Sequence, residues 1–181
     1  MRTLTCPEES MTIGVNATAF FDNLRGYDLK PIMEKHGLLD IAPDDWFPTR
    51  RYLDALNELA ETSDLLSDLV AIGIQIGMIT PMPPDLENPT LEEVLMRWDD
   101  AYQYLHRDAD VGGIVVEKVS DKHFKTIHTV VYPDDMSYGV LYGYGRRFLP
   151  AGTYFSVYYD PDHPPRDRGG QDKTIIHIKW E

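Results

Sequence analysis

The stretch FKTIHTVVYPDDMSYGVLYGYGRRFLPAGTYFSVYY, residues 124–159, decides the fold. Its apolar residues recur at every second position, then with a helical period, then at every second position again. This pattern predicts a strand at 124–131, a helix at 135–149 and a strand at 153–159. Gly139 and Gly143 lie four residues apart on one face of the expected helix. Because a glycine inside a helix costs about 1 kcal/mol, the spacing predicts close backbone packing, with the sheet of the flanking strands as the expected partner.

Further strands are expected on both sides of this stretch. IVVEKV and FKTIHTVV are separated by the turn residues SDKH, which predicts a β-hairpin at 114–131. TYFSVYY and KTIIHIKW follow the helix, joined by the charged loop DPDHPPRDRGGQD, which is expected to be mobile and too polar to pack. Helices first and strands in the order β-β-α-β-β last predict an α+β fold with a four-stranded antiparallel sheet and one inserted helix.

The domain organisation follows from the same periodicities. Residues 1–12 are expected to form a flexible leader. Residues 13–181 are expected to form one α+β domain, with a helical part at 13–113 and a sheet part at 114–181.

Capping residues locate the expected helices. Asp28 is expected to cap one helix of the helical part, and Ser63 or Asp64 is expected to open the next one. The proline-rich segment TPMPPDLENP ends the second of them. Thr90 and Glu93 then form the capping-box pattern at the start of a helix over 91–107.

Composition limits the classes of partner. The 181 residues carry a net charge of −13, which argues against binding a phosphate backbone or an anionic lipid surface. No run of about 18 apolar residues is present, so no membrane span is expected. One cysteine, Cys6, fits a reducing cytosol, and a cytoplasmic location is expected. A small molecule, a protein partner or a second copy of the chain remain as candidate partners.

Motifs of enzymes are missing from the chain. There is no G-x-S-x-G, no P-loop, no H-E-x-x-H and no G-x-G-x-x-G that opens a helix after a strand. A small enzyme that uses His128 with nearby carboxylates as acid and base is therefore the weakest hypothesis. The sequence favours a non-enzymatic protein.

The order of elements over residues 14–180 resembles a superfamily of small-molecule-binding domains. This superfamily joins the haem–nitric-oxide/oxygen-binding (H-NOX) domains, the vinyl-reductase-type domains and the TRAPP vesicle-tethering subunits. In it, a helical part leads into a four-stranded antiparallel sheet with a helix between the two hairpins. The resemblance implies either a ligand pocket between the helical part and the sheet or a protein-interaction module.

The H-NOX branch implies specific residues. The run WDDAYQYLHRDA resembles the site of the proximal haem ligand and makes His106 the corresponding histidine. The Y-x-S-x-R motif, which clamps the haem propionates, is not preserved, because Tyr132 is followed by Asp134 and Met136. Negative charge at Asp134 and Asp135 would repel propionates. A haem-based gas sensor with His106 as ligand is thus the alternative, and an uncharacterised small ligand is the main interpretation.

The residues expected to form the ligand site share a place near the 91–107 helix and the first hairpin. They are His106, Trp98, Tyr102, His128 and Tyr132. A histidine would supply polar recognition and the aromatic rings would supply shape. For each residue an ordinary structural role stays open, such as a helix-terminal histidine or a core tyrosine.

Two other polar groupings have structural alternatives of their own. His128 and His177 lie on strands, and if they met across the sheet they would form a pH-sensitive pair. Independent histidines on a half-solvated sheet are the simpler interpretation. The acidic loop at 160–172 has oxygen ligands for a hard cation but lacks the spacing of a calcium loop, so a solvated hairpin loop is expected.

Overall fold

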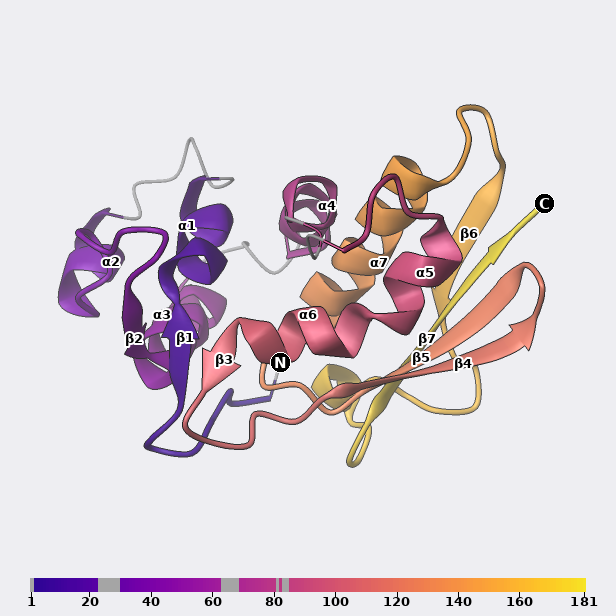
Figure 1. Cartoon of the computed structure of the whole chain (residues 1–181). Helices are drawn as coiled ribbons and strands as arrows, with labels where there is room; N and C mark the ends of the chain where they lie inside the picture. The colour runs from indigo at the N-terminus through magenta and orange to yellow at the C-terminus, as the bar shows by residue number, and fades with distance from the viewer. Residues whose placement is uncertain (1, 23–29, 63–68, 81, 83–84) are drawn as a thin grey trace.

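The computed structural model describes all residues except 1, 23–29, 63–68, 81 and 83–84. The helix caps expected at Asp28 and at Ser63 or Asp64 lie outside the described residues. Figure 1 shows a helical half and a sheet half that meet along α6 and α7. The elements are β1 (Met11–Ile13), α1 (Gly14–Asp22), α2 (Lys30–Lys35), β2 (Trp46–Pro48), α3 (Thr49–Thr62), α4 (Leu69–Ile79), α5 (Leu91–Met96), α6 (Trp98–Tyr104), β3 (His106–Arg107), β4 (Ile114–Ser120), β5 (His123–His128), α7 (Asp134–Phe148), β6 (Phe155–Tyr159), a 3-10 turn η2 (Arg166–Arg168) and β7 (Thr174–Trp180).

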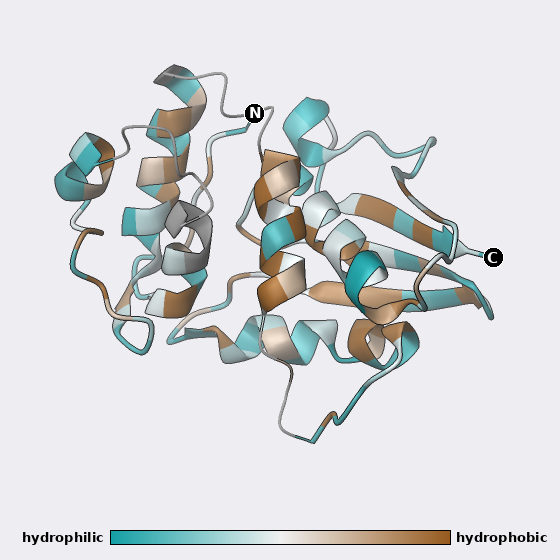
Figure 2. Cartoon of the chain, turned by 90° about the horizontal axis from the view of Figure 1, so that it is seen from above, coloured by the Kyte–Doolittle hydropathy of each residue, from teal (hydrophilic) through white to brown (hydrophobic). Residues whose placement is uncertain are grey.

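The larger sheet has four antiparallel strands in the order β4-β5-β7-β6. Phe124, Thr126 and His128 of β5 are fully buried, whereas the residues between them are partly exposed. Figure 2 shows the same alternation as bands of hydrophobic and hydrophilic residues along the strands. The expected α+β class, with α7 inserted between two hairpins, is confirmed.

The glycine face of α7 packs against another helix, not against the sheet as predicted. A Cβ atom at Gly139 would lie 2.2 Å from the carbonyl oxygen of Val70, and one at Gly73 would lie 2.2 Å from that of Met136. Gly77 and Gly143 repeat this contact one turn further along. The two backbones therefore touch, because four glycines remove the side chains that would hold α4 and α7 apart. The apolar composition of α4 suits this central position.

The helix expected over 91–107 is divided in two. The capping box is confirmed, with Thr90 and Glu93 bonding each other's backbone N–H groups. Arg97 then leaves helical geometry (φ −109°, ψ 9°) and separates α5 from α6. His106 lies beyond the end of α6, on the short strand β3.

The amino-terminal segment is packed, unlike the flexible leader expected from the sequence. Leu4 is 2 % exposed, and its backbone N–H and C=O groups both bond the side chain of Asn57 on α3. Strand β1 pairs with β2 and β3 in a small antiparallel sheet. The segment is held in place because Leu4 and Cys6, at alternate positions, are buried in the core.

The polar loop between β6 and β7 also departs from its prediction, because part of it is anchored. The side chain of Arg166 in η2 is 7 % exposed and forms an ion pair with Asp134 at the start of α7. Pro165 beside it is buried as well. A guanidinium group can be buried when a carboxylate bonds it, because the charge-assisted hydrogen bonds replace those it made with water.

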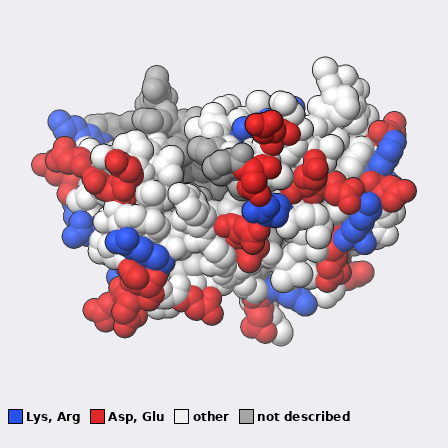
Figure 3. Space-filling view, in the orientation of Figure 1, with Lys and Arg blue, Asp and Glu red and all other residues white. Residues whose placement is uncertain are grey.

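None of the helices within the described residues is long and apolar enough to cross a membrane. Acidic and basic side chains are interspersed on the face shown in Figure 3, without an extended basic area.

Replacing Gly73 by alanine is expected to destabilise the protein by about 1–3 kcal/mol, because the new methyl group has no space against α7. Helix propensity alone would make alanine more stabilising than glycine by about 1 kcal/mol. The expected change in the free energy of unfolding therefore has the opposite sign to the one that helix propensity predicts. Urea unfolding of Gly73→Ala measures the change. Gln75→Ala, at an exposed position of α4, is the control. A stabilised Gly73→Ala variant would contradict the close helix contact.

Candidate functional site

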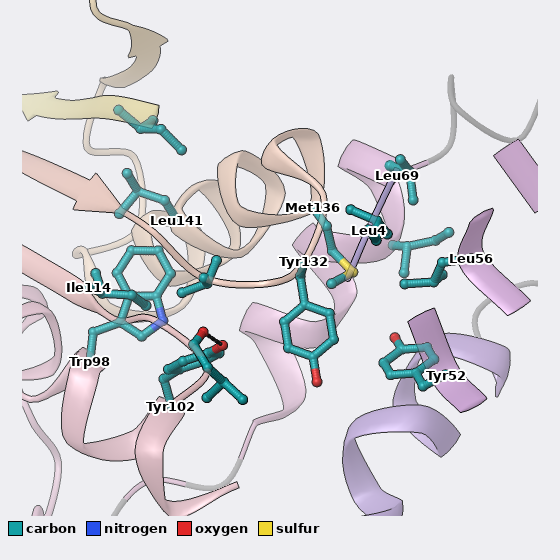
Figure 4. Packing of buried hydrophobic residues seen from close by; sticks show 14 of the residues in the cluster. Leu4, Tyr52, Leu56, Leu69, Trp98, Tyr102, Ile114, Tyr132, Met136 and Leu141 are labelled. Atoms are coloured by element: carbon teal, nitrogen blue, oxygen red, sulfur yellow. Dashed lines mark hydrogen bonds between the residues drawn. The ribbon is translucent and has the colours of Figure 1, made fainter. Parts of the chain in front are cut away.

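A cavity of about 80 Å³ lies between the sheet, α6, α7 and α4. Three of the residues singled out from the sequence, Trp98, Tyr102 and Tyr132, line it together. Figure 4 shows their rings around the space beneath α7. Its other lining residues are Asn16, Ile76, Thr80, Ala101, Leu105, Ile114, Val130, Met136, Ser137, Val140 and Tyr144.

Tyr132 joins the cavity to the helical half of the molecule through hydrogen bonds. Its hydroxyl accepts from Nδ2 of Asn16 on α1 at 2.8 Å. The same hydroxyl lies 2.8 Å from Nε2 of His106. Nδ1 of His106 lies 2.8 Å from the carbonyl oxygen of Tyr102, which can only accept, so Nδ1 carries the proton. The Tyr132 hydroxyl therefore donates to Nε2, and the direction of the whole chain is fixed.

Burial keeps these groups uncharged. Burial lowers the pKa of His106 and so favours its neutral form at pH 7. Burial likewise raises the pKa values of Tyr102 and Tyr132 well above their ordinary range. Tyr102 remains a phenol whose hydroxyl donates to the carbonyl oxygen of Val111 at 2.8 Å. The network is a chain of neutral donors and acceptors.

His106 is set back from the cavity. It is 7 % exposed, and Tyr102 and Tyr132 line the cavity in front of it. Its Nδ1–H bond to a backbone carbonyl is typical of a metal-ligating histidine, but its Nε2 atom is engaged by Tyr132. The residues present therefore do not fit a haem held through His106.

The place of the implied propionate clamp is filled by an internal ion pair. Asp134 is 1 % exposed, and Nη2 of Arg166 lies 2.7 Å from its Oδ1 atom. Burial alone would raise the pKa of Asp134, but the charge of Arg166 and several hydrogen bonds lower it below its usual value. Arg2 pairs with the neighbouring Asp167 at 2.6 Å. Asp134 stands at the motif's serine position, and Met136 stands at its arginine position and lines the cavity with an apolar side chain.

His128 is fully buried beside the cavity but does not line it. The hydroxyl of Thr126 donates to the carbonyl oxygen of Ile176, so Nε2–H of His128 donates to that hydroxyl at 2.9 Å. Nδ1 has no hydrogen-bond partner among the described residues. Burial, with the charge of Arg166, lowers the pKa of His128 to about 3. The rings of Trp98 and His128 form a T-shaped pair, with their centroids 5.1 Å apart.

His128 and His177 do not meet across the sheet, which agrees with the simpler interpretation of two independent histidines. His177 lies on the opposite, outer face of the sheet, where Nε2 of His123 approaches its Nδ1 atom at 2.9 Å. Nε2 of His177 lies 3.0 Å from Asp160. The register pairs His177 with Lys125 and His128 with Thr174, which puts the two histidines on different faces. This register was not available from periodicity alone.

Several lining residues were missed by sequence reasoning. Ser137, Val140 and Tyr144 occupy one face of α7, with the spacing of successive helical turns. That spacing could have identified them once the helix was assigned. Asn16 has no such signal, because its role depends on how α1 is placed against Tyr132.

Comparisons with known proteins identify the fold. No protein-family model and no curated protein sequence matches the chain. Among solved structures, an H-NOX protein from S. oneidensis in the Fe(II) state aligns with a TM-score of 0.64 and 12% identity, over 93% of this chain and 96% of that one. A single-substitution variant of Tt H-NOX aligns with a TM-score of 0.66 and 15% identity, over 93% and 95%. A structure concerned with haem redox potential and porphyrin distortion also gives a TM-score of 0.66 at 15% identity, over 92% and 99%.

The chain therefore has an H-NOX-like fold, and this part of the resemblance is confirmed.

His128 is expected to make the protein sensitive to acid. Its pKa is about 3 when folded and about 6.5 when unfolded, so the unfolded state binds the proton first as the pH falls. The stabilisation is complete above pH 6.5 and is lost progressively towards pH 3. Between pH 6.5 and 5 the loss is about 1–2 kcal/mol in the free energy of unfolding.

Urea unfolding across this range measures the effect. The variant His128→Leu is expected to have the shallower pH dependence, whereas Gln75→Ala, at an exposed position without a titratable group, keeps that of the wild type. Equal slopes for His128→Leu and the wild type would contradict the assignment.

Proposed function

We propose that this chain, built on an H-NOX-like fold, is a non-enzymatic small-molecule-binding domain of the sensor type. Its ligand occupies the cavity between α4, α6, α7 and the sheet. The observation that carries the proposal is the double engagement of Tyr132, which lines the cavity and bonds both Asn16 and His106. A ligand that displaces Tyr132 disturbs α1 and β3 together.

The route from cavity to helical half continues beyond Tyr132. The hydroxyl of Thr12 accepts from Asn16 at 3.1 Å and donates to the carbonyl oxygen of Leu105 at 3.1 Å. Thr12 lies on β1, which pairs with both β2 and β3. A change at the cavity wall therefore reaches the small sheet through groups that are already bonded to one another. A sensing domain requires such a connection, in which ligand binding at the cavity changes contacts elsewhere in the domain.

The side chains around the cavity support a binding role over catalysis. Among the described lining residues there is no histidine, cysteine or charged side chain. Ser137 is the only serine among them, and its hydroxyl makes no hydrogen bond to an imidazole among the described residues. A hydroxyl without a base is a poor nucleophile.

Haem-based gas sensing is the second candidate, because the similar solved structures are H-NOX proteins and haem studies. The likeness of fold favours this candidate over an unspecified ligand. The geometry of this chain does not favour it, since Nε2 of His106 is taken by Tyr132 and Asp134 is neutralised by Arg166. The cavity of about 80 Å³ is also well below the roughly 300–1,000 Å³ of ordinary ligand pockets. Interaction with a protein partner or a second copy stays a prediction.

Absorbance spectroscopy of the purified protein with added hemin separates the two candidates. We expect no Soret band that depends on His106, because the imidazole has no free nitrogen facing the cavity. His106→Ala is the test variant and His163→Ala, at an exposed histidine, is its control. A Soret band that is lost in His106→Ala and kept in His163→Ala would establish haem binding and overturn the main proposal.

Tyr132→Phe is expected to lower the stability by about 1–3 kcal/mol, because it leaves Nε2 of His106 and an N–H of Asn16 without a partner. Thermal unfolding measures the change. Tyr104→Phe on the exposed side of α6 is the matched control and is expected to be neutral. A neutral Tyr132→Phe variant would show that the hydrogen-bond chain does not tie the cavity to the helical half.

A further inference from the structure

We propose that the ligand of the cavity is a small, neutral molecule with a hydrogen-bond-accepting oxygen, of the class of short aldehydes and ketones. This inference rests on the proposed function, since it names the ligand for the same cavity. It follows from three features of the wall: unpartnered donors, the absence of charge and the small volume.

Three donors on largely buried side chains line the cavity and have no hydrogen-bond partner among the described residues. Trp98, Ser137 and Tyr144 are 7 %, 8 % and 2 % exposed, respectively. Within the described part of the chain, neither the indole N–H of Trp98 nor the hydroxyls of Ser137 and Tyr144 make a hydrogen bond to another protein group. By contrast, Tyr102, Tyr132 and Thr80 around the same cavity are all bonded.

These donors come from two different elements that face each other. Trp98 begins α6, whereas Ser137 and Tyr144 lie two turns apart on α7. The rings of Trp98 and Tyr144 meet edge to face at 5.3 Å, which holds both in place. Figure 4 shows the indole nitrogen on the side of the Trp98 ring nearer to Tyr102. A donor that faces the cavity without a protein partner is free to bond an acceptor atom of a ligand.

The type of donor defines the type of ligand atom. An indole N–H donates and cannot accept, and hydroxyls can donate as well. A carbonyl oxygen with two lone pairs satisfies two such donors at once. A ligand without an acceptor leaves the donors unpaired.

The wall also defines the ligand's charge. No described lining residue is ionised, and the buried charges of Asp134 and Arg166 close by neutralise each other. An anion or a cation would lose its hydration without gaining a counter-charge. The remaining wall is apolar and suits short alkyl groups, through Ile76, Ile114, Val130, Met136 and Val140.

The volume limits the ligand to a few atoms. A cavity of about 150 Å³ holds benzene in a well-studied engineered protein, so about 80 Å³ suits roughly three to five non-hydrogen atoms. A ligand of four such atoms binds no tighter than about tens of micromolar, because each atom contributes only a limited free energy. Binding measurements therefore need probes at millimolar concentration.

Three probes of nearly the same shape test the proposal: acetone, 2-methylpropene and acetate. Acetone is neutral with an acceptor, 2-methylpropene is neutral without one, and acetate is an anion. Two-dimensional ¹H–¹⁵N NMR of the full chain follows the indole N–H of Trp98, assigned with Trp98→Phe. The indoles of Trp46 and Trp180, which do not line the cavity, are internal controls.

We expect acetone to shift the Trp98 indole resonance saturably, while acetate at equal concentration leaves it unchanged and 2-methylpropene binds more weakly. Tyr144→Phe is expected to weaken acetone binding about threefold to tenfold, the effect of one hydrogen bond. Tyr104→Phe, an exposed tyrosine on α6, is expected to keep the wild-type affinity.

The outcomes separate this inference from the proposed function. Equal binding of acetone and 2-methylpropene, or tight binding of acetate, overturns the ligand class but leaves the cavity as a binding site. An unchanged affinity in Tyr144→Phe also overturns it. If none of the three probes shifts the Trp98 resonance, the cavity is not a ligand site and the proposed function fails with the inference.

Discussion

The contact between the backbones of α4 and α7 is the constraint on which the rest of the structure depends. Gly73 and Gly77 meet Gly139 and Gly143, and any side chain at these positions would separate the helices. Close approach gains dispersion contacts along both helices and offsets the poor helix propensity of glycine. It also fixes the rotation of α7, so that Ser137 and Tyr144 face the cavity. The position of one helix pair thus defines the shape and chemistry of the site.

A second property of the molecule is the way in which its buried polar groups are kept neutral. The chain from Asn16 through Tyr132 to His106 contains no charge, and His128 is buried as a neutral imidazole. The buried charge of Asp134 is matched by Arg166 at 2.7 Å. Burying an unmatched ion would cost several kcal/mol, so the pairing with Arg166 is what allows Asp134 to be buried. The described residues that line the cavity of this H-NOX-like fold include no ionised side chain.

The parts of the fold that depend on local patterns were predictable. The strands around residues 114–131, the helix α7 and the capping box at Thr90 follow from periodicity and spacing. The glycines of α7 predicted a close approach but could not name the partner, because α4 lies more than 50 residues away in the sequence. Trp98, Tyr102 and Tyr132 were predicted as neighbours and meet at the cavity. The pairing of His177 with His123 depends on strand register, which periodicity does not supply.

The ion pair of Arg2 with Asp167 joins residues that are 165 positions apart in the sequence. Asp167 in turn accepts from the first backbone N–H of α7, and the adjacent Arg166 holds Asp134. None of these contacts can form until synthesis has passed residue 167. Contacts between residues so distant in sequence form late, because closing a long loop carries an entropy cost before the contact returns any free energy. The contact of Arg2 with Asp167 therefore closes a longer loop, at a larger entropy cost, than the contact of Gly73 with Gly139.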